Sequence, residues 1–158
     1  MFLEVDGWKT DITFSAAHFI PSHDKCSRLH GHDYFVRARV FGEPENEFII
    51  DYLELIQLLK IIVKPMDHRI IVPDSSGTAN VSVKDGVCTV KYLEKEIRVS
   101  DSDTFHLPAP SSSSEELSKY IATELQKRVA ENQSIEKIQV CVDEGPGMGA
   151  CHEIRNRQ

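Results

Sequence analysis

The sequence predicts an α+β protein, and three observations lead to this class. Two segments, from Asp51 to Pro65 and from Ser113 to Val129, have the 3.6-residue periodicity of amphipathic helices. Alternating apolar residues precede the first helix and follow the second, which is typical of strands. The stretch between the helices, 73–107, contains short alternating runs and turns and is expected to be a β-rich insertion. Because the chain has 158 residues, residues 1–158 are expected to form one domain.

Two strands are expected before the first helix. Residues 2–19 alternate in the manner of a strand, with a possible earlier turn at Asp6-Gly7. Residues 31–42 alternate more clearly, with Val36, Ala38 and Val40 on one face. A polar loop, 21–29, separates the two strands, and a turn is expected at Pro44 and the two residues after it.

Each predicted helix has a start signal. Asp51 with Glu54, and Ser113 with Glu116, have the spacing of a capping box. The first helix is expected to bury Tyr52, Leu55, Ile56, Leu59, Ile62 and Val63, and the second Leu117, Tyr120, Ile121, Leu125 and Val129.

Strands are also expected after each helix. In the insertion, Asp85-Gly86 between residues 81–83 and 87–92 predicts a hairpin with a two-residue turn, followed by a short strand at 97–99. After the second helix, residues 138–142 alternate, the segment 144–147 is expected to turn, and residues 150–154 predict a final strand.

Charge and hydropathy exclude several classes of protein. With 18 Lys and Arg against 25 Asp and Glu, the net charge of −7 disfavours a nucleic-acid-coating protein or a polybasic membrane module. No apolar run approaches the roughly 18 residues of a spanning helix, and the first residues do not resemble a signal peptide. We therefore expect a cytoplasmic protein that binds neither nucleic acid nor membrane.

The four cysteines are expected to be reduced, because no signal peptide is recognised. No C-x-x-C pair is present. Cys141 alternates within a predicted strand, which favours packing, while Cys88 and Cys151 belong to no motif.

Three histidines indicate a metal site. His30 and His32 are two residues apart at the start of a strand, so their side chains share one face, and His18 ends the preceding strand. Three imidazoles with an open fourth position are typical of catalytic zinc. The alternative is a set of exposed loop histidines.

Cys26 lies four residues before His30, beside Lys25 and Arg28. Neighbouring cations lower the pKa of a thiol, which favours a reactive thiolate. The alternative is a fourth ligand that closes a structural zinc site.

Asp67-His68 and Glu144 carry weaker signals. A carboxylate beside an imidazole suits proton transfer, although the pair could equally be surface turn residues. Glu144 ends a strand, where it could accept hydrogen bonds from a ligand or simply be solvated.

The motifs taken together resemble one family. Phe14-Ser-Ala-Ala-His18, Cys26-x-x-x-His30-Gly-His32-Asp-Tyr, Asp67-His68-Arg69, the Ser113-Ser114-Glu115 helix start and Glu144 are similar, in order, to the 6-pyruvoyltetrahydropterin synthase and 6-carboxytetrahydropterin synthase family. The resemblance covers most of the chain outside 73–107.

The resemblance implies the tunnelling fold, a four-stranded antiparallel sheet with two helices on one face. It also implies homo-oligomers, typically hexamers built as dimers of trimers, with active sites between subunits. The implied cofactor is Zn²⁺ on His18, His30 and His32, and the implied substrate is 7,8-dihydroneopterin triphosphate.

The resemblance also implies roles for the other residues. Cys26 would be the general base, and His68, oriented by Asp67, would donate or relay a proton from a neighbouring subunit. Glu144, Ser113 and Ser114 would anchor the pterin ring, and Lys25 and Arg28 would help to hold the triphosphate.

The C-x-x-x-H spacing is similar to the 6-carboxytetrahydropterin synthases of queuosine and archaeosine synthesis, which release acetaldehyde and triphosphate. A pyruvoyl-forming enzyme, or a lyase for another dihydropterin, is the alternative, and a non-catalytic zinc- or pterin-binding protein is a third interpretation. Two residues depart from the family pattern: Asp33 stands where Asn is usual and Ser113 where Thr is usual.

Overall fold

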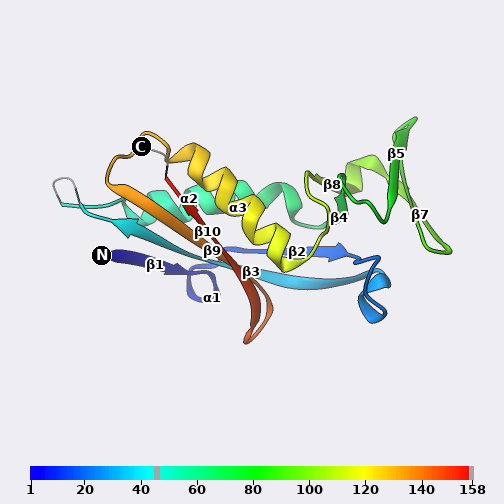
Figure 1. Cartoon of the computed structure of the whole chain (residues 1–158), viewed down its shortest axis with the longest axis horizontal. Coiled ribbons are helices and arrows are strands. Elements are labelled where there is room, and N and C mark those ends of the chain that lie inside the picture. The colour runs from blue at the N-terminus through cyan, green and yellow to red at the C-terminus, as the bar shows by residue number, and fades with distance from the viewer. Residues whose placement is uncertain (45–46, 157–158) are drawn as a thin grey trace.

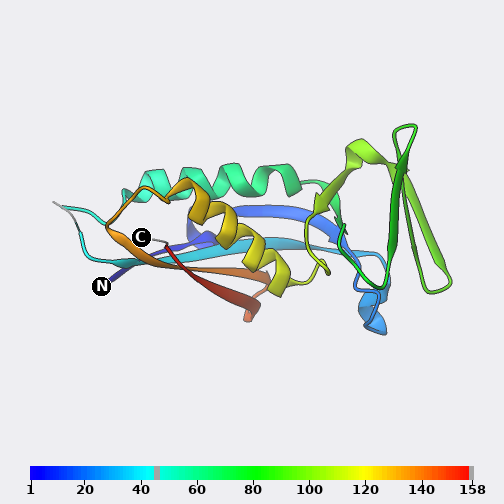
Figure 2. The same ribbon diagram turned by 45° about the horizontal axis from the view of Figure 1, so that its top comes forward.

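The computed structural model describes residues 1–44 and 47–156. The molecule is elongated, with one large sheet, two helices on one face of it and a small separate sheet at one end (Figure 1). Turning the molecule shows both helices on the same side of the large sheet, as expected (Figure 2). None of the described helices is long and apolar enough to cross a membrane.

The expected antiparallel strands form most of the large sheet, in the order β10-β9-β3-β2. The strand expected over residues 2–19 is split, because a short helix, α1, interrupts it and its first part, β1, also pairs with β3. The bounds are β1 (Phe2–Asp6), α1 (Gly7–Thr10), β2 (Thr13–His18), β3 (His30–Gly42), β9 (Ile135–Gly145) and β10 (Met148–Arg155).

Two short strands extend this sheet beyond β2 and make it mixed rather than wholly antiparallel. β4 (Arg69–Pro73) runs parallel to β2, and β8 (Thr104–Leu107) runs parallel to β4. The buried run in β4 has no alternation, and its partners are distant in sequence, so periodicity gives no sign of it. As a result, the end of the 73–107 stretch belongs to the large sheet.

The helices are α2 (Tyr52–Val63) and α3 (Ser114–Arg128), and both bury most of the expected apolar face, with Ile56 and Tyr120 only half-buried. Tyr52 is 54% exposed, because the first turn of α2 extends beyond the core. The Asp51 side chain accepts hydrogen bonds from the backbone N–H groups of Leu53 and Glu54. The second capping box was wrong: Ser113 is the N-cap residue of α3, but its side chain makes no capping hydrogen bond.

The insertion forms its own antiparallel sheet of β5 (Asn80–Lys84), β6 (Val87–Tyr92) and β7 (Lys95–Ser100). Asp85 and Gly86 both have positive φ, as a two-residue hairpin turn requires. A second hydrophobic core joins this sheet to the body of the molecule. Its buried members are Phe19, Val72, Ala79, Cys88, Val90 and Tyr92.

The expectation of four reduced cysteines was wrong. Cys141 on β9 and Cys151 on β10 stand directly opposite each other and form a disulfide, whereas Cys26 and Cys88 are free. The β9–β10 register places the two Cα atoms 4.0 Å apart, a pairing that strand alternation alone does not reveal.

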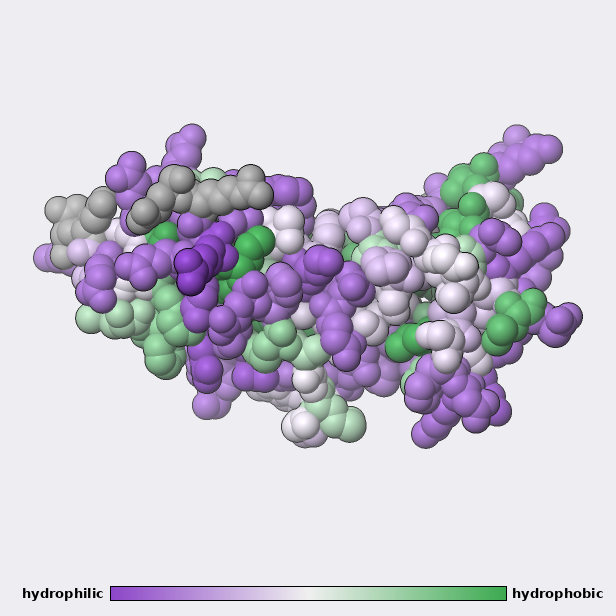
Figure 3. All heavy atoms as spheres, viewed as in Figure 1, coloured by the Kyte–Doolittle hydropathy of each residue, from purple (hydrophilic) through white to green (hydrophobic). Residues whose placement is uncertain are grey.

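The turn expected after Pro44 falls partly on residues 45–46, which lie outside the described residues. Figure 3 shows a mainly hydrophilic surface on the viewed face. The molecule is narrower between its body and the inserted sheet.

Candidate functional site

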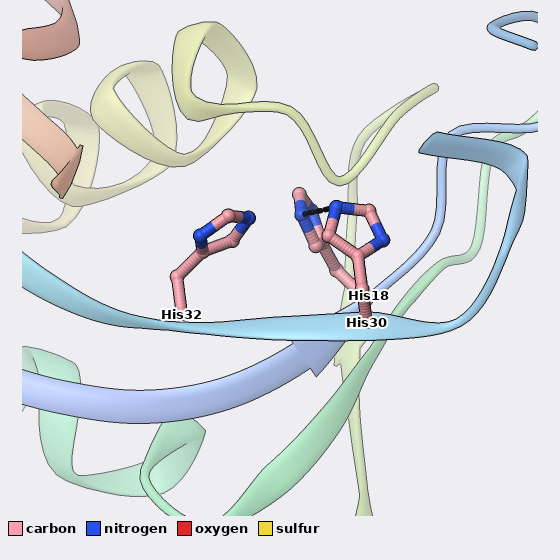
Figure 4. Close-up of side chains that lie close together, drawn as sticks. All are labelled: His18, His30 and His32. Atoms are coloured by element: carbon pink, nitrogen blue, oxygen red, sulfur yellow. Dashed lines mark hydrogen bonds between the residues drawn. The ribbon is translucent and has the colours of Figure 1, made fainter. Parts of the chain in front are cut away.

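Three imidazoles converge at the end of β2 and the start of β3. His18 and His30 are direct partners across the two antiparallel strands, and His32 lies on the same face two residues farther along β3. Their ring centroids are 4.5–5.1 Å apart, and each ring contributes one nitrogen to a group within 4.8 Å. Figure 4 shows all three rings on the same side of β3.

Hydrogen bonds fix the orientation of two of these rings. Nδ1 of His18 donates to the backbone carbonyl of Ser112 at 2.8 Å, and Nδ1 of His30 donates to that of Arg28 at 2.7 Å. A carbonyl can only accept, so in a neutral ring Nε2 carries the lone pair. The two Nε2 atoms nevertheless lie only 3.1 Å apart, an arrangement that a shared cation would stabilise.

The ring of His32 also indicates a site for a metal ion. Among the described residues, Nε2 of His32 is buried without a hydrogen-bond partner, and a carboxylate oxygen of Glu144 lies 3.9 Å away. The pKa of His18 is lowered to about 4, mainly by burial and to a smaller extent by the neighbouring His30 and His32, against the opposing effect of the Ser112 bond. Three imidazoles whose ring nitrogens converge on one point are the donor set that a divalent metal requires.

Two further residues lie close to the histidines and were not predicted as site residues. Ser112 is fully buried; its carbonyl orients His18, and its hydroxyl donates to the carbonyl of Phe19. Tyr34 follows His30 and His32 on the same face, and its buried hydroxyl has no hydrogen-bond partner in the described part of the chain. Burial, and then the charge of Glu144, raise the pKa of Tyr34. The period-two alternation along β3 could have identified Tyr34, whereas nothing in the sequence marks a backbone carbonyl.

Cys26 lies in the loop between β2 and β3, within a short 3-10 helix, Lys25–Ser27. It is half-buried, and its sulfur is not part of the three-histidine group. The side chains of Lys25 and Arg28 are exposed, although the Arg28 carbonyl supports His30. The histidines therefore form a three-nitrogen group without the cysteine.

Asp67 and His68 lie at the edge of β2, beside Ser15. Asp67 accepts a hydrogen bond from the backbone N–H of Ser15 at 2.9 Å, and its other oxygen lies 2.9 Å from Nδ1 of His68. The Ser15 bond, and then His68, lower the pKa of Asp67. The side chain of His68 is 83% exposed and lines a pocket with Ser15, Ala17 and Asp33, which alternate with the buried residues of β2 and β3. His32 lines the same pocket, but neither Asp67 nor His68 belongs to the three-nitrogen group of its own chain.

Ser113 and Ser114 open α3, directly after the residue that orients His18. Both are half-buried, and the hydroxyl of Ser113 is not used for capping. Glu144 and the start of α3 therefore approach the histidine group from two different elements.

Comparisons with known proteins agree with this geometry. A family model described as 6-pyruvoyl tetrahydropterin synthase matches residues 8–154. A Methanocaldococcus jannaschii protein, provisionally named 6-carboxy-5,6,7,8-tetrahydropterin synthase, is 32% identical over 156 residues and 96% of each chain. A Pyrococcus abyssi protein with the same provisional name is 30% identical over 84% of this chain and 80% of its own.

Solved structures support the fold as well. The crystal structure of 6-pyruvoyl tetrahydropterin synthase from Plasmodium vivax aligns with a TM-score of 0.90 and 25% identity, over 98% of both chains. The chain therefore has the tunnelling fold and belongs to the 6-pyruvoyl tetrahydropterin synthase family of pterin enzymes.

Proposed function

We propose that this protein converts 7,8-dihydroneopterin triphosphate to 6-carboxy-5,6,7,8-tetrahydropterin, acetaldehyde and triphosphate. The observation that carries the proposal is the group of three imidazoles with converging nitrogens, beside Glu144. The names of the relatives and the short spacing from Cys26 to His30 support the carboxy-forming branch.

The reaction balances without a redox cofactor. Loss of triphosphate and transfer of hydrogen from the side chain to the ring give a tetrahydropterin with two adjacent carbonyl carbons. Addition of one water across the bond between them gives a carboxylate and acetaldehyde. Oxidation of the side chain thus supplies the reduction of the ring.

Different residues of the site bind the metal and transfer the proton in this reaction. His18, His30 and His32 would hold Zn²⁺, which acts as a Lewis acid toward the hydroxyls of the substrate side chain. Cys26 is the base that removes a proton from that side chain, which requires its thiolate form.

Substrate binding uses the surrounding elements. Glu144 accepts hydrogen bonds from the N–H groups of the pterin ring, and Ser113 and Ser114 contact the ring from the start of α3. Lys25 and Arg28 project from the exposed loop, where they attract the triphosphate.

The exposed pair, Asp67 and His68, acts across a subunit boundary. It is exposed and lies outside the three-nitrogen group of its own chain, so it serves as proton donor to the site of a neighbouring subunit. This requires a homo-oligomer, and we propose a hexamer arranged as a dimer of trimers.

Product analysis tests the proposal. The purified protein is incubated with 7,8-dihydroneopterin triphosphate, and pterins and acetaldehyde are quantified by mass spectrometry. We expect carboxytetrahydropterin and acetaldehyde in equal amounts. A Glu144→Gln variant serves as control, because it keeps the metal ligands and should bind substrate weakly.

A second candidate is the pyruvoyl-forming reaction, favoured by the high structural similarity to the Plasmodium vivax enzyme. A pyruvoyl product without acetaldehyde would identify it. No turnover by zinc-loaded protein on any dihydropterin would contradict both reactions and indicate a binding protein.

A further inference from the structure

A second group of ligand side chains lies where the inserted sheet meets the large sheet. The sulfur of Cys88, a carboxylate oxygen of Asp101 and a nitrogen of His106 all lie within 4.8 Å of one another. They come from three elements: β6, the short 3-10 helix Asp101–Asp103 that follows β7, and β8. None of these residues belongs to the motifs on which the proposed reaction depends.

The His106 ring is oriented by a carboxylate on its far side. Nδ1 lies 2.7 Å from Oδ1 of Asp74, the residue that follows β4, whereas Nε2 faces Asp101 at 2.8 Å. Asp74 accepts the Nδ1 proton, and without an ion Nε2–H donates to Asp101; an ion that displaces this proton would meet the Nε2 lone pair between Asp101 and Cys88. A carboxylate behind the imidazole is the usual outer partner of a metal-bound histidine.

Asp101 is held in place before any ligand binds. Its backbone N–H donates to the carbonyl of Gly86 at 2.9 Å, and the hydroxyl of Thr104 donates to its carbonyl at 2.7 Å. These bonds connect Asp101 both to the hairpin turn of the insertion and to the first residue of β8. The backbone of Asp101 is thus fixed, and its Oδ1 already lies 2.8 Å from Nε2 of His106.

Cys88 distinguishes a metal site from an ordinary ion pair. A doubly protonated His106 could bridge Asp74 and Asp101 without any metal, but such a bridge needs no thiol. Here a free cysteine, fully buried on β6, directs its sulfur at the same point. Thiolate and imidazole together select zinc over the hard cations that carboxylates alone would bind.

We propose that Cys88, Asp101 and His106 bind a zinc ion, with Asp74 as the residue that positions His106. The side chains of His106 and Asp101 are 29% and 37% exposed, so an ion can enter from solvent and keep a water as fourth ligand. The ion would join the inserted sheet to β8 and hence to the large sheet. This site does not depend on the proposed reaction.

Metal analysis of variants that lack the first site tests the proposal. In a His30→Ala/His32→Ala protein purified with zinc, we expect one ion per chain by plasma mass spectrometry. Adding His106→Gln, a change at a half-exposed position, should remove that ion. Circular dichroism checks that each variant is folded. No zinc in the double variant would overturn the proposal, as would a zinc content that His106→Gln leaves unchanged.

Cobalt substitution shows which cysteine sulfur binds the metal. Co²⁺ added to the double variant should give a thiolate-to-metal charge-transfer band that Cys88→Ala abolishes. Cys26→Ala, which removes the other free thiol, should leave the band intact, and the opposite pattern would assign the ion to Cys26.

The role of Asp74 is tested in the same His30→Ala/His32→Ala variant. There Asp74→Asn should weaken metal affinity by about 10–100-fold, as expected for an outer partner of a histidine ligand. An unchanged affinity would contradict the role of Asp74.

Discussion

The hydroxyl of Tyr92, in the inserted sheet, donates a 2.8 Å hydrogen bond to the backbone carbonyl of Ser27, the residue after Cys26. The ammonium group of Lys95 donates to the same carbonyl at 2.9 Å and to the Ser27 hydroxyl at 3.0 Å. The ring of Tyr92 also stacks on Phe19, one residue beyond His18, with centroids 4.7 Å apart. The insertion therefore supports the loop between two parts of the site.

Because of these bonds, we expect substitutions in the insertion to lower the free energy of unfolding, and a double substitution to lower it more than a single one. Tyr92→Phe should cost about 1 kcal/mol of unfolding free energy, because the carbonyl keeps its bond from Lys95. Tyr92→Phe/Lys95→Met leaves that buried carbonyl without either donor and should cost roughly 1–3 kcal/mol more. Denaturant unfolding measures both losses.

The same variants should lower kcat, because the loop carries the proposed base, and should raise KM, because the loop also carries Lys25 and Arg28. Lys84→Ala, at an exposed position of β5 in the same sheet, is the matched control and should leave both constants unchanged. Full kcat in the double variant would show that the loop does not need the insertion.

Replacing Cys26 shows whether this residue is a general base or a metal ligand. Cys26→Ala should lower kcat by about 10²–10⁴-fold, the contribution of a general base, with the zinc of the histidine group retained. The sulfur lies outside that group, so metal content and melting temperature should change little. Loss of zinc together with stability would instead identify Cys26 as a ligand.

Mixing two inactive variants tests whether sites are shared between subunits. Cys26→Ala and His68→Ala chains, unfolded and reassembled in equal amounts, should regain about a quarter of wild-type activity, because one site in four would combine both intact residues. Each variant reassembled alone is the control. A mixture as inactive as its components would place Cys26 and His68 of the same chain in one site.

Asp143 should make stability depend on pH in the acid range. Burial acts to raise its pKa, but hydrogen bonds from Arg37 and Trp8 outweigh this effect, so the pKa lies below its ordinary value of 3.8. The ionised form therefore stabilises the fold above about pH 4, and this contribution is lost as the pH falls toward the folded-state pKa.

Calorimetry between pH 5 and pH 3 checks this expectation. The melting temperature of Asp143→Asn should fall less over this range than that of the wild type. Glu131→Gln, a change at an exposed carboxylate, should keep the wild-type slope. Parallel curves for Asp143→Asn and wild type would contradict the prediction.

Part of the candidate site follows directly from local sequence. His30 and His32 share a face because strand side chains alternate, and His18 can join them because a short loop returns the chain antiparallel. The same alternation places Tyr34 beside them, although this residue was not anticipated as part of the site. The turn at Asp85-Gly86 likewise follows from its residue types.

Other features depend on contacts between distant segments. The carbonyl of Ser112 is 94 positions from His18, and any residue type would supply it. Cys141 and Cys151 pair only because the β9–β10 register sets them opposite each other, with an irregularity at Met148 and Gly149. Sequence spacing says nothing about either relationship.

The sequence by itself determined the α+β class, the two helices with most of their buried faces, the antiparallel strands and the residues of the histidine group, because periodicity and short spacing are local properties. Only the tertiary structure decided that β4 and β8 extend the sheet, that the insertion supports the Cys26 loop, and that Cys88, Asp101 and His106 meet. These relationships arise from parallel pairing and core packing between segments that are far apart along the chain, and no local pattern encodes them.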